Sequence, residues 1–406
     1  MRKIVCLVLS LFLLGCASTT QSRLNAVQNN FSNADFTPTT ENEKTEQNNL
    51  ELLINGMALF HDNKFAQSDS LFEEFNKRNL DETSSSVSRE VAGLLLGQGV
   101  NSYKPYMMDS LFVSYYQIWD LLALQDWANA RVVINQSYTR QQNMSREYEK
   151  LIEENKNKIV ENSTYGEIID KNTADWFAFT DIMNPALMYL SGIYFLNDGD
   201  FDNAITYLKR ANGMMPESSF IKHDLELAQK RIKPIHTTWQ FIDTGFAPRL
   251  KEEQDGIFLP NLGMIYFTFS SPYFDNNFIQ PPHSELIANV DAMFITEYKE
   301  YRTNEILRSF TSAASKATLQ ATMYNSHSDS APILGILSSV YTVASSNTDV
   351  RTWATLPKYI YVIRTENLNN LYGHDTIKDE IGNGNNNLIY TRIFNNKNDT
   401  KIIKLK

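Results

Sequence analysis

The chain has 406 residues, of which 42% are hydrophobic, so it is long enough for two or three domains with well-packed cores. Its formal net charge is −10, and it has no basic stretch suited to a phosphate backbone, which argues against a nucleic-acid partner. An acidic surface is equally unsuited to docking on anionic lipid headgroups, so any membrane affinity has to come from another source.

The N-terminus has the parts of a bacterial lipoprotein signal peptide. A basic start precedes the apolar run 4–14, and the sequence Leu-Leu-Gly-Cys at 13–16 matches the lipobox. An apolar run of about 11 residues suits a signal peptide but is shorter than the roughly 20 residues that span a bilayer. We therefore predict a signal peptide over 1–15 and acyl chains, palmitate among them, on Cys16. The alternative is an ordinary signal peptide with a chance cysteine.

Processing at this point determines the compartment and the thiol chemistry. Ala17, rather than aspartate, follows Cys16, which by the enterobacterial sorting rule favours the periplasmic face of the outer membrane. Cleavage removes Cys6, and acylation consumes the thiol of Cys16, so a cysteine nucleophile, a zinc–thiolate site and an iron–sulfur cluster are excluded. Loss of two basic residues with the signal peptide takes the net charge to −12.

Residues 16–48 are polar and have no helical period. We expect a lipidated cysteine followed by a disordered tether. A coil of about 30 residues reaches roughly 30 Å, which would let the folded part hang below the membrane.

From 49 to 234 the spacing of apolar residues predicts helices, and one segment has the features of a tetratricopeptide (TPR) unit. Small residues at two places let antiparallel helices approach closely, large apolar residues fill the wedge between them, and a proline ends the second helix. The residues of this unit are Gly192, Gly199, Phe201, Ala204, Leu208, Ala211 and Pro216.

Two weaker copies of the same pattern precede that unit, about 62 and 74 residues apart, so additional helices interrupt the repeat. The alternative for both is generic helical hairpins. Residues 136–160 are charged nearly all round and predict a long projecting helix. The weaker copies comprise Gly56, Phe65, Ser68, Phe72 and Phe75 in one, and Leu121, Trp127, Ala130 and Ile134 in the other.

From 235 to 406 short β-rich runs alternate with helical stretches near 284–325 and 331–345, which predicts an α+β domain. The expected fold is therefore α-rich and multidomain, with a TPR-like helical domain followed by an α+β domain. The predicted strands are 237–242, 264–269, 358–364, 388–394 and 401–405.

Several stretches together resemble a group of proteobacterial outer-membrane lipoproteins that has a repeat-like helical half and a shared C-terminal half. The resemblance covers roughly 50–370 and implies envelope location, and weakly a link to penicillin-binding-protein activators, but no activity. The matching segments are Tyr103-Lys104-Pro105-Tyr106, Asn184-Pro185 with Tyr189-Leu190-Ser191-Gly192, Thr244 to Pro248, and Asp349-x-Arg351-x-Trp353-x-x-Leu356-Pro357.

We find no catalytic motif: G-x-S-x-G, H-E-x-x-H, a P-loop and G-x-G-x-x-G are all missing. The six histidines lack metal-ligand spacing, so we predict no metal and no cofactor. The enzymatic alternative is an envelope hydrolase that uses carboxylates such as Asp255 or Asp275 and needs two of them roughly 5 to 10 Å apart.

The segment around Asp349, Arg351 and Trp353 has two interpretations. It is a ligand site with a polar clamp and an aromatic wall, or a structural corner in which Trp353 pins the chain to the core. A helix carrying Arg302, Arg308 and Lys316 would give such a site a cationic lining, or is its solvent-exposed side.

The sequence therefore predicts a non-enzymatic, periplasm-facing lipoprotein that acts as a protein–protein interaction scaffold, anchored through acyl chains and binding another envelope protein. A regulator of peptidoglycan synthesis is the narrower alternative. The apolar segment 331–344 is too short to span a membrane and is expected to be a buried helix. Candidate partner contacts are Tyr115, Tyr116, Trp119, Trp127 and Trp176, unless they are core.

Overall fold

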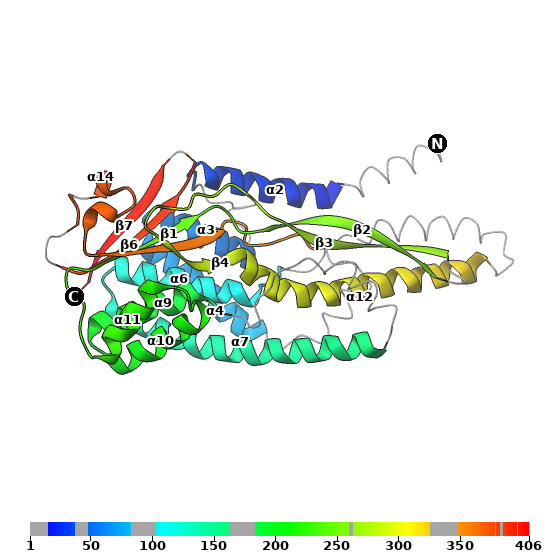
Figure 1. The fold of residues 1–406 in the computed structure, drawn as a ribbon. Helices are drawn as coiled ribbons and strands as arrows, with labels where there is room; N and C mark the ends of the chain where they lie inside the picture. The colour runs from blue at the N-terminus through cyan, green and yellow to red at the C-terminus, as the bar shows by residue number, and fades with distance from the viewer. Residues whose placement is uncertain are drawn as a thin grey trace.

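The structure is a computed structural model that describes residues 15–36, 48–82, 103–161, 183–259, 263–324, 348–377, 379–381, 385–395 and 397–405. Within these residues, helices pack along one side of a five-stranded sheet, and long elements extend from one end of the molecule (Figure 1). The chain is thus mostly helical with an α+β part, as the sequence predicts.

Three helical hairpins and one further helix form the helical part. In each hairpin two or three residues separate the paired helices, so the helices are antiparallel neighbours. The hairpins are α3 (Asn49–His61) with α4 (Phe65–Glu82), α6 (Met107–Ala123) with α7 (Trp127–Glu161), and α9 (Pro185–Asp198) with α10 (Phe201–Met214), followed by α11 (Ser219–Gln229).

The turn between α9 and α10 shows how local residues define a hairpin. Asn184 caps α9 by accepting a hydrogen bond from the Leu187 amide at 3.0 Å. Gly199 ends α9 in the left-handed region with φ 83°, where a side chain would be strained. Asp200 then caps α10. Gly199 is the glycine that the predicted repeat unit has at this turn.

Two of the hairpins contain a very close helix crossing at a glycine. A Cβ atom added at Gly192 would lie 2.6 Å from the side chain of Leu208, and one added at Gly56 would lie 2.6 Å from Phe72. Leu208 and Phe72 are fully buried at these crossings. The small-against-large pairing expected from the sequence is therefore present in both hairpins.

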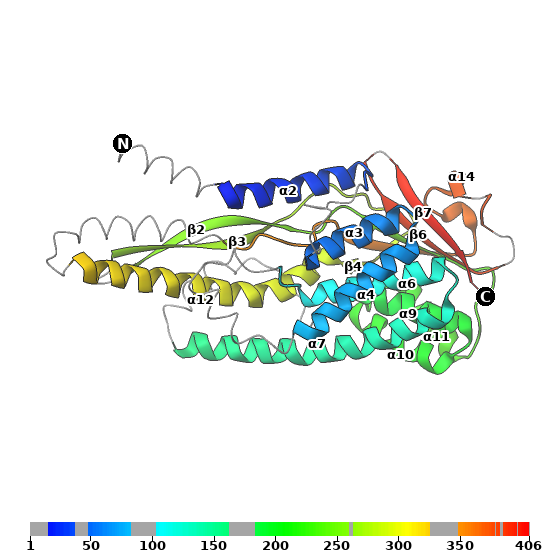
Figure 2. The same ribbon diagram turned by 180° about the vertical axis from the view of Figure 1, so that it is seen from behind.

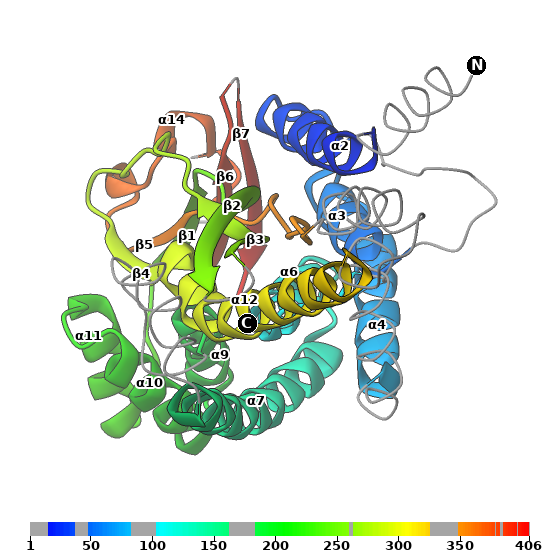
Figure 3. The same cartoon turned by 90° about the vertical axis from the view of Figure 1, so that its right-hand side faces the viewer.

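The main sheet has the order β4-β5-β1-β6-β7, and its strands are β1 (Thr238–Thr244), β4 (Glu285–Asn289), β5 (Tyr359–Thr365), β6 (Asn387–Ile393) and β7 (Asn398–Lys404). β1 and β6 are parallel, and the other pairs are antiparallel. One face packs on helices, whereas the 3₁₀ turn η2 (Leu368–Asn370) and α14 (His374–Ile377) cover the opposite face (Figure 3).

The helices and the sheet share one hydrophobic core. Trp119 of α6 contacts Phe241 of β1 and Tyr390 of β6, with ring centroids 5.6 and 5.4 Å apart. The predicted change from helical spacing to β-rich runs near 235 thus coincides with the first strand, but it does not separate two hydrophobic cores. Each amphipathic helix face and the inner face of the sheet bury one another, which is why neither half forms its own closed core.

The second sheet is a long two-stranded ribbon of β2 (Arg249–Leu259) and β3 (Gly263–Tyr273), packed on the 35-residue helix α12 (Val290–Tyr324). Phe267 and Phe269 of the ribbon pack with Ile306 and Phe310 of α12 in a separate apolar cluster. Both elements extend beyond the sheet at one end of the molecule (Figures 1 and 2). We call residues 256–259, 263–269 and 306–324 the arm.

The expected disordered tether is wrong over its first half, because Gly15–Ser32 forms the helix α2. Val27 and Phe31 are buried, Gln28 donates a hydrogen bond to the Ala354 carbonyl at 3.2 Å, and the Asn395 amide donates to Ser32 at 3.0 Å. The helix is amphipathic along a narrow stripe only, so its polar composition concealed the buried face. Residues 37–47 lie outside the described part.

The predicted strands at 237–242, 264–269, 358–364, 388–394 and 401–405 coincide with β1, β3, β5, β6 and β7, shifted by a few residues. β2 and β4 were not predicted. β4 occupies the start of the stretch expected to be helical from 284, and the segment 331–345 lies outside the described residues. The predicted helix 136–160 is part of α7, which begins nine residues earlier at Trp127. It does not project freely, since Tyr148 donates to the Thr296 carbonyl of α12 at 2.8 Å.

Candidate functional site

The predicted lipidation residue is at the first turn of α2. Cys16 is the second residue of a helix whose other end is fixed to the body, and its side chain is outside the part of the chain that can be described. Arg249 Nη1 donates to Asn25 Oδ1 at 2.7 Å, which adds a contact between α2 and the base of the ribbon. A group attached at position 16 would therefore be connected to the body by a helix and not by a coil.

In the segment 349–353, the charged side chains bind each other and the tryptophan is buried. Arg351 Nε and Nη2 donate to the two carboxylate oxygens of Asp349 at 2.7 and 2.6 Å, which leaves this fork-shaped pair directed at itself. Trp353 is 2% exposed and packs between Phe72 and Tyr116, with ring centroids 6.0 and 6.2 Å away. This geometry fits the structural interpretation of the segment and offers no aromatic wall to a ligand.

Most of the aromatic residues named as partner contacts are in the core. Tyr115, Tyr116 and Trp119 are at most 1% exposed, and they face the sheet. Trp127 is partly buried and stacks on Tyr194 with ring centroids 6.2 Å apart. Trp176 lies outside the described residues. Tyr115, Tyr116 and Trp119 therefore cannot reach a partner unless α6 unfolds.

Buried aspartates connect the helices to the sheet. Asp224 of α11 is fully buried and accepts hydrogen bonds from the Tyr189 hydroxyl, from Trp239 Nε1 and from Arg364 Nε, each at 2.7 Å. Its partners belong to α9, β1 and β5. A single carboxylate thus holds two helices on two strands, and sequence analysis did not identify it because its partners are distant in the chain.

Asp243 of β1 plays a similar part for α6. Its Oδ2 accepts from the hydroxyls of Tyr116 and Tyr390, both at 2.9 Å. Burial raises the pKa of Asp243 to about 6, opposed by the Arg392 charge and by the two tyrosine hydrogen bonds. Arg392 donates to the Gly245 carbonyl at 2.7 Å and covers the Phe246 ring. These groups are enclosed in the core and reach no surface opening.

A third buried cluster comprises His61, Asp399 and Lys401. His61 Nδ1 lies 2.7 Å from Asp399 Oδ2, and Lys401 Nζ lies 2.9 Å from the same atom. Burial lowers the pKa of His61 to about 4 against the opposing effect of Asp399, so the imidazole is neutral at pH 7 and donates from Nδ1. Asp399 is thus balanced by Lys401, and the short His61–Asp399 contact is a hydrogen bond to a carboxylate and not an ion pair.

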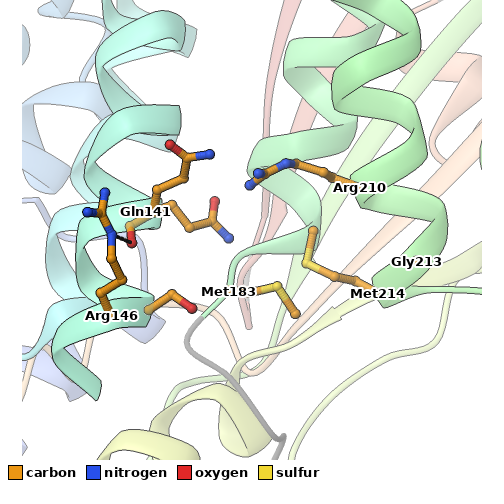
Figure 4. A pocket seen from close by; sticks show the side chains of 8 residues that line it. Gln141, Arg146, Met183, Arg210, Gly213 and Met214 are labelled. Carbon is orange, nitrogen blue, oxygen red and sulfur yellow. Dashed lines mark hydrogen bonds between the residues drawn. The ribbon is translucent and has the colours of Figure 1, made fainter. Parts of the chain in front are cut away.

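A groove lies between α7 and α10 (Figure 4). Its volume is about 570 Å³. Met183 and Met214 give an apolar, adaptable floor, and Arg210 faces it from α10. Arg146 belongs to the α7 side, where its Nε donates to the Gln142 carbonyl at 3.3 Å and its Nη2 to Asn143 Oδ1 at 2.9 Å. Arg210 lies over the Tyr138 ring at 4.1 Å, which holds its guanidinium at the groove. Gln141 is 3% exposed and its Oε1 has no hydrogen-bond partner.

The residues proposed for a cationic lining and for hydrolysis do not converge. Arg302 is buried over the Phe269 ring at 4.6 Å, and Arg308 is exposed on the same helix. In the ribbon, Asp255 is paired with Phe267, and Arg249, six residues earlier in β2, is paired with Tyr273. These pairs are thus roughly 20 Å apart. Asp275 lies beyond Tyr273, so the two carboxylates are too distant for a glycosidase pair.

Comparison of the chain with protein-family models, with curated proteins and with solved structures gives no match. Among the described residues, no group of three His, Cys, Asp or Glu side chains is arranged to hold a metal ion. No helix in that part of the chain combines the length and the apolar character that a membrane crossing requires.

Proposed function

We propose that this chain is a lipid-anchored protein of a bacterial envelope, held by acyl chains on Cys16, whose TPR-like helical hairpins bind another envelope protein from the periplasmic face of the outer membrane. The observation that supports it is the continuity from lipobox to body. Cys16, the predicted lipidation residue, is the second residue of α2, and Val27 and Phe31 of the same helix are buried in the core.

This continuity changes the expected mechanics of anchoring. About 16 Å of helix separates Cys16 from Val27, whereas the coil expected from the sequence would reach roughly 30 Å. Acyl chains at position 16 would therefore hold the body against the bilayer with a defined end facing it. More than one chain gives stable anchoring where a single chain gives marginal binding.

The groove between α7 and α10 suggests what the partner presents. The Arg210 guanidinium, held at the groove over the Tyr138 ring, can recognise a carboxylate, and a methionine floor accepts irregular apolar side chains. A partner segment that carries acidic and apolar residues would satisfy both kinds of group.

The experiment combines labelling with crosslinking. Palmitate fed to growing cells should label the wild-type chain and not Cys16→Ser, and crosslinking in the native envelope should recover a defined partner. Arg210→Glu should reduce that recovery severalfold, because it reverses the charge at the groove. Lys209→Glu makes the same change on the exposed side of the same helix and serves as control.

The outcomes divide the proposal into parts. Absence of palmitate label would remove the anchor. Equal recovery with Arg210→Glu and Lys209→Glu would remove the groove as the binding site. Recovery of a penicillin-binding protein would narrow the function to regulation of peptidoglycan synthesis, which is the more specific alternative.

A further inference from the structure

The arm has one buried face and one exposed apolar face. On the buried face, Ile265, Phe267 and Phe269 pack on α12. On the opposite face Phe258, Met264 and Tyr266 are 69%, 53% and 57% exposed. Phe258 and Met264 are paired in register. Tyr266 lies beside Gly256, where an added Cβ would be 3.0 Å from its ring. The three side chains therefore form one continuous apolar strip.

Charge is distributed unevenly between the arm and the rest of the chain. The whole chain carries −10, but residues 256–272 contain no charged residue at all. Residues 306–324 contain only Arg308 and Lys316, so the arm is positive and has no carboxylate. Other exposed apolar side chains lie outside the arm, among them Val132, Ile235 and the chain neighbours Phe278 and Ile279. An apolar, weakly cationic tip is unusual on an acidic protein.

The position of the arm agrees with this composition. The N-terminal end of α2, which carries Cys16, and the arm point toward the same end of the molecule (Figures 1 and 2). The five-stranded sheet and α11 lie toward the opposite end. Because α2 is docked to the body, the two features keep this relation. Acyl chains at position 16 would bring the exposed strip to the bilayer.

We propose that the arm is a second membrane contact, in which Phe258, Met264 and Tyr266 enter the interface of a bilayer containing anionic phospholipid. The inference rests on the proposed anchor at Cys16 and adds a site to it. Phenylalanine and tyrosine are suited to the boundary between headgroups and acyl chains, and the exposed Arg308 favours anionic headgroups. The contact would fix the orientation of the groove relative to the membrane.

A nitroxide spin label tests the contact in the full acylated chain. Acylation of Cys16 leaves no free thiol in the mature protein, so Phe258→Cys and Met264→Cys each provide one labelling position. The matched control is Ile235→Cys, which is 72% exposed in the wild type and lies between α11 and β1. Each labelled protein is placed in vesicles of phosphatidylethanolamine and phosphatidylglycerol.

The inference predicts that labels at 258 and 264 collide more with dissolved oxygen than with a water-soluble nickel complex, and that the label at 235 does the reverse. Replacing phosphatidylglycerol by phosphatidylcholine should shift the label at 258 toward water. Nickel accessibility at 258 equal to that at 235 would overturn the inference, and so would spin–spin broadening that shows a second copy seated on the strip.

Failure of the anchor would be seen separately. Wild-type protein should take up no label; if Cys16 reacts, it is not acylated, and the proposed anchor fails. Acylated protein with a water-exposed label at 258 would refute only the second contact. Because the three side chains are on the exposed face, the substitutions leave the packing on α12 intact, which amide exchange of β3 checks.

Discussion

The body and the arm are stabilised by different interactions. In the body, buried carboxylates such as Asp224 and Asp243 accept hydrogen bonds from several elements at once, within one core shared by helices and sheet. In the arm, a two-stranded ribbon packs through one face on a single helix. Polar networks specify one arrangement of elements, whereas a small apolar cluster can open by itself. The body should thus unfold as a unit, and the arm should open before it.

The largest effect is expected from the carboxylate that joins four elements. Asp224→Ala leaves the Tyr189 hydroxyl, Trp239 Nε1 and the Arg364 guanidinium buried without their acceptor. We expect a loss of about 3 to 5 kcal/mol in the free energy of unfolding. Urea denaturation followed by near-ultraviolet circular dichroism measures it.

The control for this change is an exposed aspartate near the same helix. Asp202 pairs with Arg231 at 2.6 Å, and both side chains are mostly exposed. Asp202→Ala should cost less than about 1 kcal/mol. Equal losses for the two variants would contradict the idea that the body depends on buried carboxylates.

A smaller and pH-dependent effect is expected from His61. Burial lowers its pKa to about 4 from the ordinary value of 6.5. The imidazole therefore binds a proton at higher pH in the unfolded chain than in the folded one. The contribution of the neutral, buried His61 to stability is complete above pH 6.5 and is lost as the pH falls toward 4. The loss is on the order of 3 kcal/mol.

Urea midpoints at pH 7.5, 5.5 and 4.5 measure this dependence. His61→Gln should flatten the slope between pH 6.5 and 4, because no imidazole remains to be protonated. His223→Gln, on α11 at an exposed position, is the control and should leave the slope unchanged. Burial raises the pKa of Asp109 and Glu305 to about 7, which changes stability in the opposite direction, so the test is the difference between the two chains. Equal slopes for the wild type and His61→Gln would contradict the low pKa of His61.

The next largest change in stability is expected at the glycine where α9 and α10 cross. In Gly192→Ala the new Cβ would lie 2.6 Å from the fully buried Leu208 side chain, so α9 and α10 must separate or Leu208 must leave its position. We expect about 1 to 3 kcal/mol of destabilisation. Gly213→Ala on α10 meets nothing within 4 Å and should stabilise the chain by up to about 1 kcal/mol. Opposite signs for the two variants would show that the crossing, and not glycine itself, matters.

Features of the fold that depend on residues close together in the sequence were predicted, and features that depend on distant residues were missed. The crossing at Gly192 and the turn at Gly199 were predicted because they are local and depend on spacing within one hairpin. β2 was missed because Lys251 to Gly256 is polar, and its strand conformation depends on pairing with β3. α2 was missed because only its narrow buried stripe is apolar.

The buried polar groups could not be derived in the same way. Asp224 meets a partner 140 residues away, and the His61–Asp399 pair spans 338 residues. An indication was nonetheless present, since Asp243 directly follows Phe241 and Ile242 in a strand, and His61 follows Phe60 in a hydrophobic helix. Charged residues in such surroundings are buried with partners more often than they are exposed, which the pattern of apolar residues alone does not show.

The smallest effect on global stability should come from the arm. Phe310 is 6% exposed and packs edge-to-face on Phe267, with ring centroids 6.0 Å apart. Phe310→Ala removes the centre of the arm's apolar cluster, yet no residue of that cluster belongs to the shared core of the body. Because the arm can open separately, we expect the free energy of global unfolding to fall by less than about 1 kcal/mol.

Amide hydrogen exchange resolves where the loss occurs. Protection of β3 from Ile265 to Phe269 should fall by at least roughly tenfold in Phe310→Ala, while protection of β1 and β6 stays at the wild-type value. Arg308→Ala, on the exposed side of the same helix, should change neither. If β1 lost protection together with β3, the arm would be part of the same cooperative unit as the body. The exposed strip would then be presented by a rigid element, and docking of the arm on a membrane would be transmitted directly to the groove between α7 and α10.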